Sequence, residues 1–223
     1  NHWGDGTIDD DPSAYENGTL VDDPHGAIDL ANSGLDITGA IAILNVGSFK
    51  TWTRRVLSHS GNTFTYDPVP GWKTKHHDYF LEGQLAFLDT AGEWFLDTLT
   101  YELYFWPPDN GDPNDLSIRG KVQSYAFEIS NSDHVQIKNI EFFGTTFNFS
   151  NCDYTLIENC NLWFPSCYKR MLGVVDNQPD MSLFTSSSNC LVYKCAFRYT
   201  DGSVLEMYSG SNTIEDCYFY HID

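Results

Sequence analysis

The chain has 223 residues, of which 31 are Asp or Glu and only 12 are Lys or Arg, giving a formal net charge of −19. Such an acidic surface repels nucleic acids and anionic membranes, so we expect neither as a partner. The sequence also lacks an apolar run of about 18 residues, so we expect no membrane span. Its first residues show no basic stretch followed by an apolar one.

Residues 1–39 form an acidic segment that is rich in Asp, Gly and Asn. Its carboxylate clusters, such as Asp9–Asp11 and the pair Asp22 and Asp23, suit a solvated loop region with a short helix around Gly26–Ser33. Carboxylates are also ligands that calcium prefers, so a calcium site is the alternative interpretation. The regularly spaced acidic residues of a calcium-binding loop are missing, and the sequence specifies no other cofactor.

Residues 40–120 are predicted to form a small antiparallel β module. Three stretches have the texture of strands, namely Ala40–Val46, Trp52–Leu57 and Thr63–Tyr66. Short stretches that contain Gly, Ser and Asn separate them and favour tight turns. These strands are expected to pair with one another and to stand apart from the repeats that follow.

The next stretch reads as a helix or tight loop that leads into a β-hairpin. Trp94 and Leu96 are predicted to share one face of its first strand. Leu103 and Phe105 lie on the returning strand. The two prolines from Pro107 onward end the pairing, because proline has no amide hydrogen to donate.

Four copies of one pattern recur in residues 121–223. Each copy has an aliphatic residue, a polar residue two positions later, Ile or Cys at the third position and an apolar residue at the fifth. The copies begin at Ile137, Ile157, Val192 and Ile214, at spacings of 20, 35 and 22 residues. One turn therefore carries an insertion of roughly 13 residues within a regular repeat. Short strands at this period predict a parallel β-helix, in which each turn buries its apolar side on its neighbours.

The polar residue within each copy marks a kink between two strands. Asn139, Asn159, Lys194 and Asp216 hold this position, and Asn and Asp most readily accept left-handed backbone angles. Ser- and Asn-rich tetrapeptides precede the copies, as in Ser130–Asp133. We expect them to form the preceding corner, with side chains hydrogen-bonded from turn to turn.

The six cysteines fall into two groups. Three occupy the same position of successive copies and are predicted to form a buried stack of small apolar side chains; these are Cys160, Cys195 and Cys217. The other three lie near corners or in the insertion, where a disulfide and free thiols are equally compatible with the sequence; these are Cys152, Cys167 and Cys190.

The hairpin carries a recognisable motif, Leu88-Asp-Thr-Ala-Gly-Glu-Trp-Phe-Leu-Asp97 with Leu103-Tyr-Phe-Trp-Pro-Pro108. Followed by β-helix repeats, it resembles the "LD-x-PGEW-Y-LD … LYYWPP" signature of secreted right-handed parallel β-helix proteins. Many of these resemble glycoside hydrolases and polysaccharide lyases. The resemblance covers roughly residues 25–223, with Ala91 in place of Pro and Tyr101 near the place of the turn Gly.

The resemblance implies an all-β protein, with a right-handed parallel β-helix after a small β module, located outside the cell or on its surface. It also implies a polysaccharide partner, and it makes Glu93 and Asp97 structural carboxylates of the hairpin. Because the sequence stops in the middle of a repeat at His221–Asp223, we expect the β-helix to continue in a longer polypeptide.

Chemistry in a β-helix must lie on outward side chains or loops, because the inward side chains are used for stacking. Glycoside hydrolysis needs two carboxylates, one as the acid and the other as the nucleophile or base. Asp201, Glu206 and Asp223 are the candidates, and the insertion Pro165–Asp180 would form a wall beside them.

A lyase would instead need a group that removes a proton beside a uronate carboxylate, together with a cation that neutralises this carboxylate. His221, Tyr199, Arg198 and Arg170 have suitable chemistry. The predicted substrate-binding residues, which offer cations or flat rings to a sugar, are Arg170, Arg198, Tyr199, Tyr208 and Trp163. No basic cluster for polyuronates is present, which favours a hydrolase over a lyase.

Two classes of non-enzymatic function remain open. The chain fits a carbohydrate-binding or adhesive β-helix without catalysis. It also fits a structural subunit of an extracellular filament or surface layer, since uncapped β-helix ends can stack chain on chain in self-association.

Overall fold

The computed structural model describes residues 4–5, 16–23, 28–47, 50–73, 77–175 and 178–222. Over these ranges the regular elements are β-strands and short 3-10 helices. None of the helices found there is long and apolar enough to cross a membrane. The chain forms two compact units, one made of residues 1–117 and 170–176, the other of residues 118–169 and 177–223.

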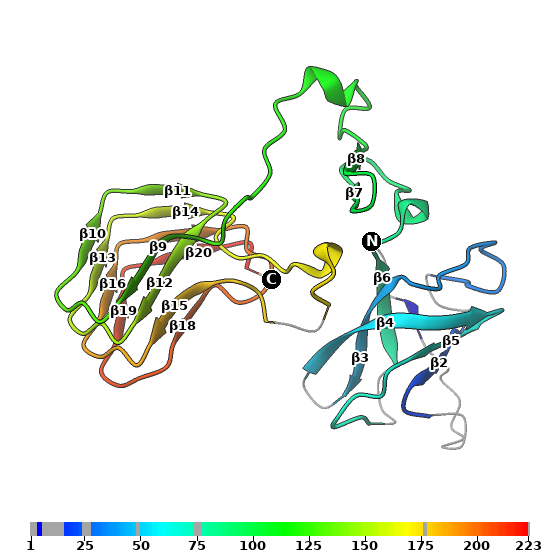
Figure 1. Cartoon of the computed structure of the whole chain (residues 1–223), viewed down its shortest axis with the longest axis horizontal. Coiled ribbons are helices and arrows are strands. Elements are labelled where there is room, and N and C mark those ends of the chain that lie inside the picture. Colours follow the sequence, from blue (N-terminus) through cyan, green and yellow to red (C-terminus); the bar gives the residue numbers. More distant parts are fainter. Residues whose placement is uncertain are drawn as a thin grey trace. The chain divides into compact units, whose positions relative to one another are not determined.

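The first unit contains a six-stranded sheet in the order β1-β6-β3-β4-β5-β2 (Figure 1). Each neighbouring pair in this sheet is antiparallel. The strands are β1 (Gly4–Asp5), β2 (Thr19–Val21), β3 (Ile41–Gly47), β4 (Lys50–Ser60), β5 (Thr63–Tyr66) and β6 (Asp78–Glu82). The three predicted strands and their antiparallel pairing are therefore confirmed.

Strand β6 corrects the prediction of a helix or loop at the start of the hairpin region. Its residues alternate in burial, with Tyr79 and Leu81 in the core and Phe80 and Glu82 less buried. This period of two is typical of a half-buried strand. The helix expected around Gly26–Ser33 is also wrong for its described part, where Leu30 to Asn32 form a turn.

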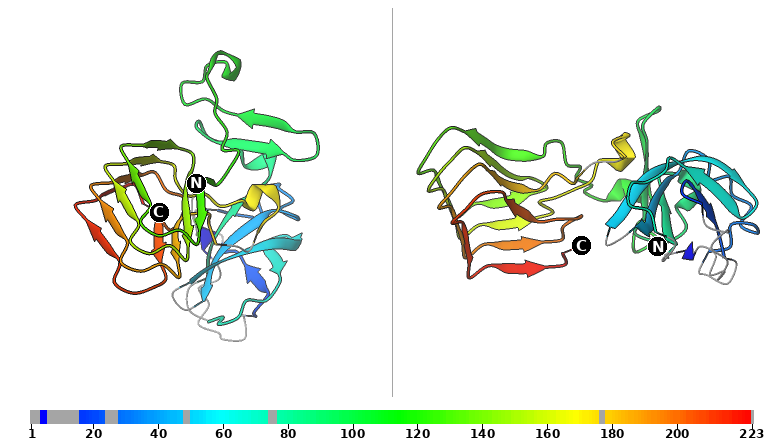
Figure 2. Two further views of the ribbon diagram at one scale, coloured as in Figure 1. Left: turned by 60° about the vertical axis from the view of Figure 1, so that its left-hand side comes forward. Right: turned by 90° about the horizontal axis from the view of Figure 1, so that it is seen from below.

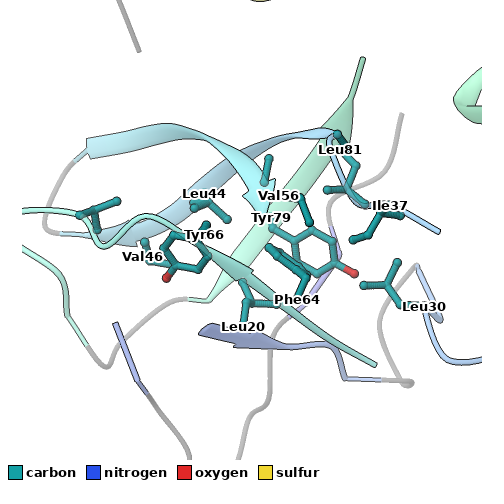
Figure 3. Packing of buried hydrophobic residues seen from close by; sticks show 13 residues of the cluster. Leu20, Leu30, Ile37, Leu44, Val46, Val56, Phe64, Tyr66, Tyr79 and Leu81 are labelled. Carbon is teal, nitrogen blue, oxygen red and sulfur yellow. The ribbon is translucent and has the colours of Figure 1, made fainter. Parts of the chain in front are cut away.

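The core of the first unit draws side chains from the acidic segment as well as from the sheet (Figure 3). Leu20 packs with Phe64 and Tyr79, whose rings meet edge to face at 5.3 Å. Asp22 is buried and accepts hydrogen bonds from the Tyr79 hydroxyl at 2.5 Å and the Leu30 amide at 2.9 Å. Burial raises the pKa of Asp22. The segment thus contributes to the core and is more than a solvated loop.

The hairpin forms as predicted. It consists of a 3-10 helix η2 (Leu85–Phe87), the antiparallel strands β7 (Trp94–Asp97) and β8 (Glu102–Phe105), and a second 3-10 helix η3 (Pro113–Asp115). Trp94 pairs with Phe105, and Leu96 pairs with Leu103. Tyr101 adopts a left-handed φ of 61°, which explains why the related signature has Gly near this position.

The two hairpin carboxylates hold turns. Glu93 Oε2 accepts hydrogen bonds from the amides of Asp89 and Thr90 at 2.9 and 3.1 Å. Asp97 Oδ1 accepts one from the Leu99 amide at 2.8 Å. Both groups are therefore used in the local structure, in agreement with the structural role that the resemblance implies.

The second unit is a parallel β-helix with three sheets of four strands each (Figures 1 and 2). The first sheet contains β10 (Gln136–Lys138), β13 (Leu156–Glu158), β16 (Leu191–Tyr193) and β19 (Thr213–Glu215). The second contains β11 (Glu141–Phe143), β14 (Asn161–Trp163), β17 (Ala196–Arg198) and β20 (Tyr218–Tyr220). The third contains β9 (Tyr125–Ser130), β12 (Thr146–Ser150), β15 (Ser182–Thr185) and β18 (Leu205–Met207).

The repeat read from the sequence matches the register of the first sheet. Its four starting residues, Ile137, Ile157, Val192 and Ile214, lie beside one another on adjacent strands. The longest spacing contains the insertion between β14 and β15, which holds the 3-10 helix η4 (Arg170–Leu172). The spacing of 20, 35 and 22 residues therefore follows from one β-helix turn per copy.

The predicted kinks are confirmed. Asn139, Asn159, Lys194 and Asp216 have left-handed φ angles of 57°, 52°, 52° and 53°. Side chains also bond between turns, as expected: Asn159 Nδ2 donates to Asn139 Oδ1 at 2.6 Å. At the upstream corner Asn151 donates to Asn131 in the same way at 2.7 Å.

Apolar columns fill the interior of the β-helix. Phe149 and Phe184 are fully buried and stack at 5.3 Å between ring centroids. Cys160 and Cys195 are buried in the same core, as predicted, whereas Cys217 in the last described turn is only partly buried and packs against this core. All six cysteines are free, and Cys190 Sγ donates to the Cys152 carbonyl oxygen at 3.3 Å. The disulfide considered among Cys152, Cys167 and Cys190 is therefore not formed.

The last described turn of the β-helix exposes residues of the inward columns. Ile214 is 47% exposed and Phe219 is 41% exposed, whereas Ile157 and Phe197, which hold the same columns in earlier turns, are fully buried. These apolar side chains lack a neighbouring turn on one side. Self-association through this end stays a prediction.

Candidate functional site

The outer face of the second β-helix sheet gathers aromatic side chains into a column. The inward residues Phe142, Leu162 and Phe197 are buried, so the residues on either side of them point outward. Strand register places Phe143, Trp163, Arg198 and Tyr220 beside one another in successive turns. We define the aromatic column as Phe143, Trp163, Phe164, Arg198, Tyr199, Tyr218, Tyr220 and His221.

Ring stacking runs along this column. Tyr199 stacks on Trp163 at 6.0 Å and on Phe164 at 5.4 Å between ring centroids. Tyr199 also stacks on His221, at 5.3 Å with the planes inclined by only 14°, and meets Tyr220 edge to face at 5.6 Å. Offset stacks of this kind are favourable beyond the area that they bury. The column is thus an ordered surface of rings.

Three of these aromatic residues occupy left-handed backbone positions. Phe164, Tyr199 and His221 have φ angles of 53°, 56° and 49°, and the equivalent corner of the first turn has Gly144 at 66°. A bulky residue at this angle costs roughly 1–2 kcal/mol. Strained backbone of this kind clusters at functional sites. The rings are therefore retained where glycine would cost less.

Arg198 lies within the column. Its guanidinium carbon is 4.9 Å from the Trp163 ring centroid and 5.4 Å from that of Tyr218. Nη1 donates to Asn161 Oδ1 at 3.1 Å. In the sheet the small residue Ala196 stands between Asn161 and Tyr218, and it is buried.

Glu206 and Tyr208 lie apart from the column, on the third sheet. Glu206 is flanked by Leu205 and Met207, which pack against the core, so its side chain points outward. A hydrogen bond with Glu206 raises the pKa of Tyr208. The structure therefore brings these two residues together but separates them from Arg198 and Trp163.

A second carboxylate on the third sheet is too distant to pair with Glu206. Glu128 lies opposite Asn148, which lies opposite Leu183, which in turn lies opposite Glu206. Three strand spacings separate the two glutamates, or roughly 14 Å. Carboxyl pairs in glycoside hydrolases are about 5–9.5 Å apart, which excludes this pair as the acid and its partner.

Asp201 lies at the corner that follows the column, two residues after Tyr199. Its Oδ2 accepts a hydrogen bond from the Tyr168 amide at 3.0 Å, and its own amide donates to Ser166 Oγ at 3.2 Å. Next to it, Gly202 has a φ of 86°, and a Cβ there would lie 2.9 Å from the Tyr168 ring. The Asp201 carboxylate thus holds the beginning of the insertion in place.

The two ends of the insertion meet in a polar cluster within the second unit. Cys167 and Asp180 form an isolated β-bridge. Asp180 pairs with Lys169 at 2.5 Å and accepts a hydrogen bond from the Ser124 hydroxyl. Burial opposes ionisation of Asp180, but Lys169 and Ser124 outweigh it and lower the pKa of this carboxyl. These contacts give the insertion a fixed base.

Two other predicted site residues do not join the column. Arg170 binds Glu82 through two hydrogen bonds, at 2.5 Å from Nε and 3.3 Å from Nη2, and belongs to the first compact unit. Asp223 lies outside the described residues, as does the Asp9–Asp11 run that suggested calcium. Within the described ranges, no group of three or more His, Cys, Asp or Glu side chains is arranged to hold a metal ion.

Sequence reasoning found half of the column and missed the rest. Trp163, Arg198, Tyr199 and His221 were candidates, and the structure brings them together. The residues that were missed are Phe143, Phe164, Tyr218 and Tyr220, with Arg119 above the Phe143 ring at 5.4 Å. They share outward or corner positions of the repeat, so counting alternate positions in every copy would have identified them.

Comparisons with known proteins support the fold. No family model matches the chain, and no curated protein matches its sequence. A solved structure described as "Glycoside hydrolase" is similar to it. The TM-score is 0.64 at 13% sequence identity over 98% of this chain. At this identity the likeness concerns the fold alone, and the chain spans 52% of the length of that structure.

Proposed function

We propose that this chain belongs to an extracellular glycoside hydrolase and binds a complex polysaccharide along the aromatic column. The observation that carries the proposal is the column itself, which exposes stacked rings at successive outward positions. Phe143, Tyr199 and Tyr218 are 51%, 39% and 51% exposed. Exposed aromatic patches mark binding surfaces, and flat rings suit the apolar faces of sugars. The glycoside hydrolase fold of the similar structure supports the choice of ligand.

Hydrolysis would use two carboxylates, and Asp201 and Glu206 are the described candidates. One of them, when protonated, would donate to the departing glycosidic oxygen, while the other would attack the sugar or activate water. Asp201 follows Tyr199 closely in the chain, so it is the carboxylate that best fits a sugar bound at this end of the column. Asp223 remains a candidate outside the described residues.

The test of hydrolysis is incubation with neutral, sulfated and uronate polysaccharides, followed by assays of new reducing ends and of ultraviolet absorbance. Reducing ends without absorbance support a hydrolase. Both signals together would identify a lyase and move the chemistry to His221, Tyr199 and the arginines. Asp201→Asn and Glu206→Gln should each abolish turnover with an unchanged circular dichroism spectrum. Full activity in both variants would eliminate this pair.

A non-catalytic carbohydrate-binding β-helix is the second candidate function. The hydrogen bond from the Tyr168 amide favours it, because this bond already gives the Asp201 carboxylate a structural role. Under this alternative the polysaccharides bind without any turnover. Affinity electrophoresis on the same panel separates the two functions, since it detects binding independently of cleavage.

A matched pair of variants tests the column as the binding surface. Tyr199 and Tyr154 both have a φ of 56° and both stack on a histidine, at 5.3 and 5.0 Å respectively. Only Tyr199 belongs to the column. Losing one ring contact of about 1.4 kcal/mol weakens binding about tenfold. We expect this loss in Tyr199→Ala and none in Tyr154→Ala. Equal effects in both variants would contradict binding at the column.

A further inference from the structure

We propose that the aromatic column recognises an acidic polysaccharide, through a notch on the second sheet that binds a carboxylate or sulfate group of the sugar. The notch consists of Asn161, Trp163, Ala196, Arg198 and Tyr218. This inference deepens the proposed function and rests on it, because it assigns the charge of the glycan that the column binds.

The Arg198 guanidinium is held in place before any ligand arrives. Trp163 and Tyr218 contact it from neighbouring turns through their rings, at 4.9 and 5.4 Å. Asn161 fixes Nη1 through a hydrogen bond of 3.1 Å. A side chain that is already ordered loses less entropy when it binds a ligand. The remaining N–H groups of its planar fork match the geometry of a carboxylate or sulfate.

Arg198 differs from three other cations, Lys138, Lys169 and Arg170, in what it contacts. Lys138, Lys169 and Arg170 each form an ion pair with Glu158, Asp180 and Glu82 respectively. Among the residues that the structure describes, no carboxylate lies within ion-pair distance of Arg198. Arg119 adds a second positive charge to the column, above the Phe143 ring. In a chain with a net charge of −19, such a face is complementary to an anion.

One acidic side chain lies on the same face. Glu141 and Asn161 are neighbours in the strand register, as are Asn161 and Ala196. Glu141 is therefore two strand spacings from the strand of Arg198, or about 10 Å. Charges at this separation are largely screened at physiological ionic strength, where the Debye length is about 8 Å. Glu141 thus leaves the attraction of Arg198 for an anion at contact distance in place.

The experiment compares oligosaccharides of matched length that are neutral, carboxylated or sulfated. Binding to the whole chain is measured by calorimetry at low and at high salt. The variants are Arg198→Gln and Arg198→Lys, with Lys138→Gln as the control for an equal loss of charge on the neighbouring sheet. Circular dichroism verifies that each variant is folded.

We expect the acidic oligosaccharides to bind more tightly than the neutral one, with an advantage that shrinks at high salt. Arg198→Gln should weaken acidic binding by about tenfold or more, as expected for loss of a hydrogen bond to a charged group. It should weaken binding of the neutral oligosaccharide much less, because that ligand forms no charge-assisted hydrogen bond with the guanidinium. The affinity of Arg198→Lys for acidic oligosaccharides should fall between those of the unmodified protein and Arg198→Gln, because lysine keeps the charge but not the planar fork. Lys138→Gln should behave like the unmodified protein.

The outcomes separate this inference from the function on which it rests. Equal affinity for neutral and acidic oligosaccharides, or an equal loss of both in Arg198→Gln, overturns the acidic notch while binding to the column stands. Binding of none of the three classes overturns both proposals. A preference between carboxylated and sulfated ligands identifies which anion the notch accepts.

Discussion

Removing the Phe184 ring should destabilise the β-helix far more than removing the Phe143 ring. Phe184 is fully buried on β15, stacks on Phe149 at 5.3 Å and meets Phe147 edge to face at 5.5 Å. Phe143 is 51% exposed on the outer face of β11. The two substitutions delete the same atoms, so the difference between them measures burial and packing.

The expected loss for Phe184→Ala is about 3–5 kcal/mol, the usual range for removing a buried phenylalanine ring. The stacked pair with Phe149 accounts for roughly 0.5–1.5 kcal/mol of this loss. The Phe143 ring buries about half as much area as the Phe184 ring or less, and its removal leaves no internal cavity. Phe143→Ala should therefore lower the free energy of unfolding by about 1 kcal/mol or less. A domain of this size is stable by only about 5–15 kcal/mol in total.

Urea unfolding measures both losses. Trp163 is the only tryptophan in the sequence ranges of the second unit. Its fluorescence therefore reports the unfolding of this unit once the fluorescence of a Trp163→Phe variant has been subtracted. With a urea dependence of about 1–3 kcal/mol per molar, Phe184→Ala should lower the midpoint by roughly 2 M. Phe143→Ala should leave the midpoint nearly unchanged but weaken glycan binding. Similar midpoint shifts in the two variants would refute the assignment of inward and outward faces.

Three further predictions concern single groups. Burial raises the pKa of Asp22 above the 3.8 of an exposed carboxyl, so the folded state holds the Asp22 proton more tightly than the unfolded state does. The free energy of unfolding of the first unit should therefore fall as pH rises from 3.8 through the raised pKa. In Asp22→Asn, the melting temperature should lose this dependence on pH. Gly202→Ala should destabilise the second unit in urea unfolding by more than about 1 kcal/mol, because it places a Cβ at a left-handed φ of 86° and against the Tyr168 ring. Burial also raises the pKa of the Cys190 thiol, so a thiol reagent followed by mass spectrometry should modify the partly exposed Cys167 first and Cys190 only after unfolding.

The β-helix was predictable because its repeat is a direct record of strand register. Ile137 and Ile157 are 20 residues apart because one turn of the β-helix brings them side by side. The kinks are also recognisable in the sequence, because their left-handed backbone angles favour Asn, which is found at Asn139 and Asn159. Both signals are local and recur in every turn, so they survive without any knowledge of tertiary contacts.

The third sheet left no comparable signal. Its strand β15 is separated from the preceding copy by the insertion, so the apolar residue Phe184 does not stand at a fixed offset from Leu162. The partner of Arg170 was equally hidden, because Glu82 lies 88 residues away in the chain. Contacts of this kind depend on how separate segments meet, which neither periodicity nor composition records.

The candidate site was half predicted for a related physical reason. Core positions and kinks are dictated by folding, so their residue types reveal the backbone. At the corner that holds Phe164, Tyr199 and His221, the residue types do not follow from the backbone. The left-handed angles there favour glycine, which is found at Gly144 in the first turn. Folding alone therefore does not account for three rings in this place. Tyr154 shows the same mismatch at another corner, so it is the combination of these corner rings with the exposed rings of the second sheet that directs attention to this face as the place where a ligand binds.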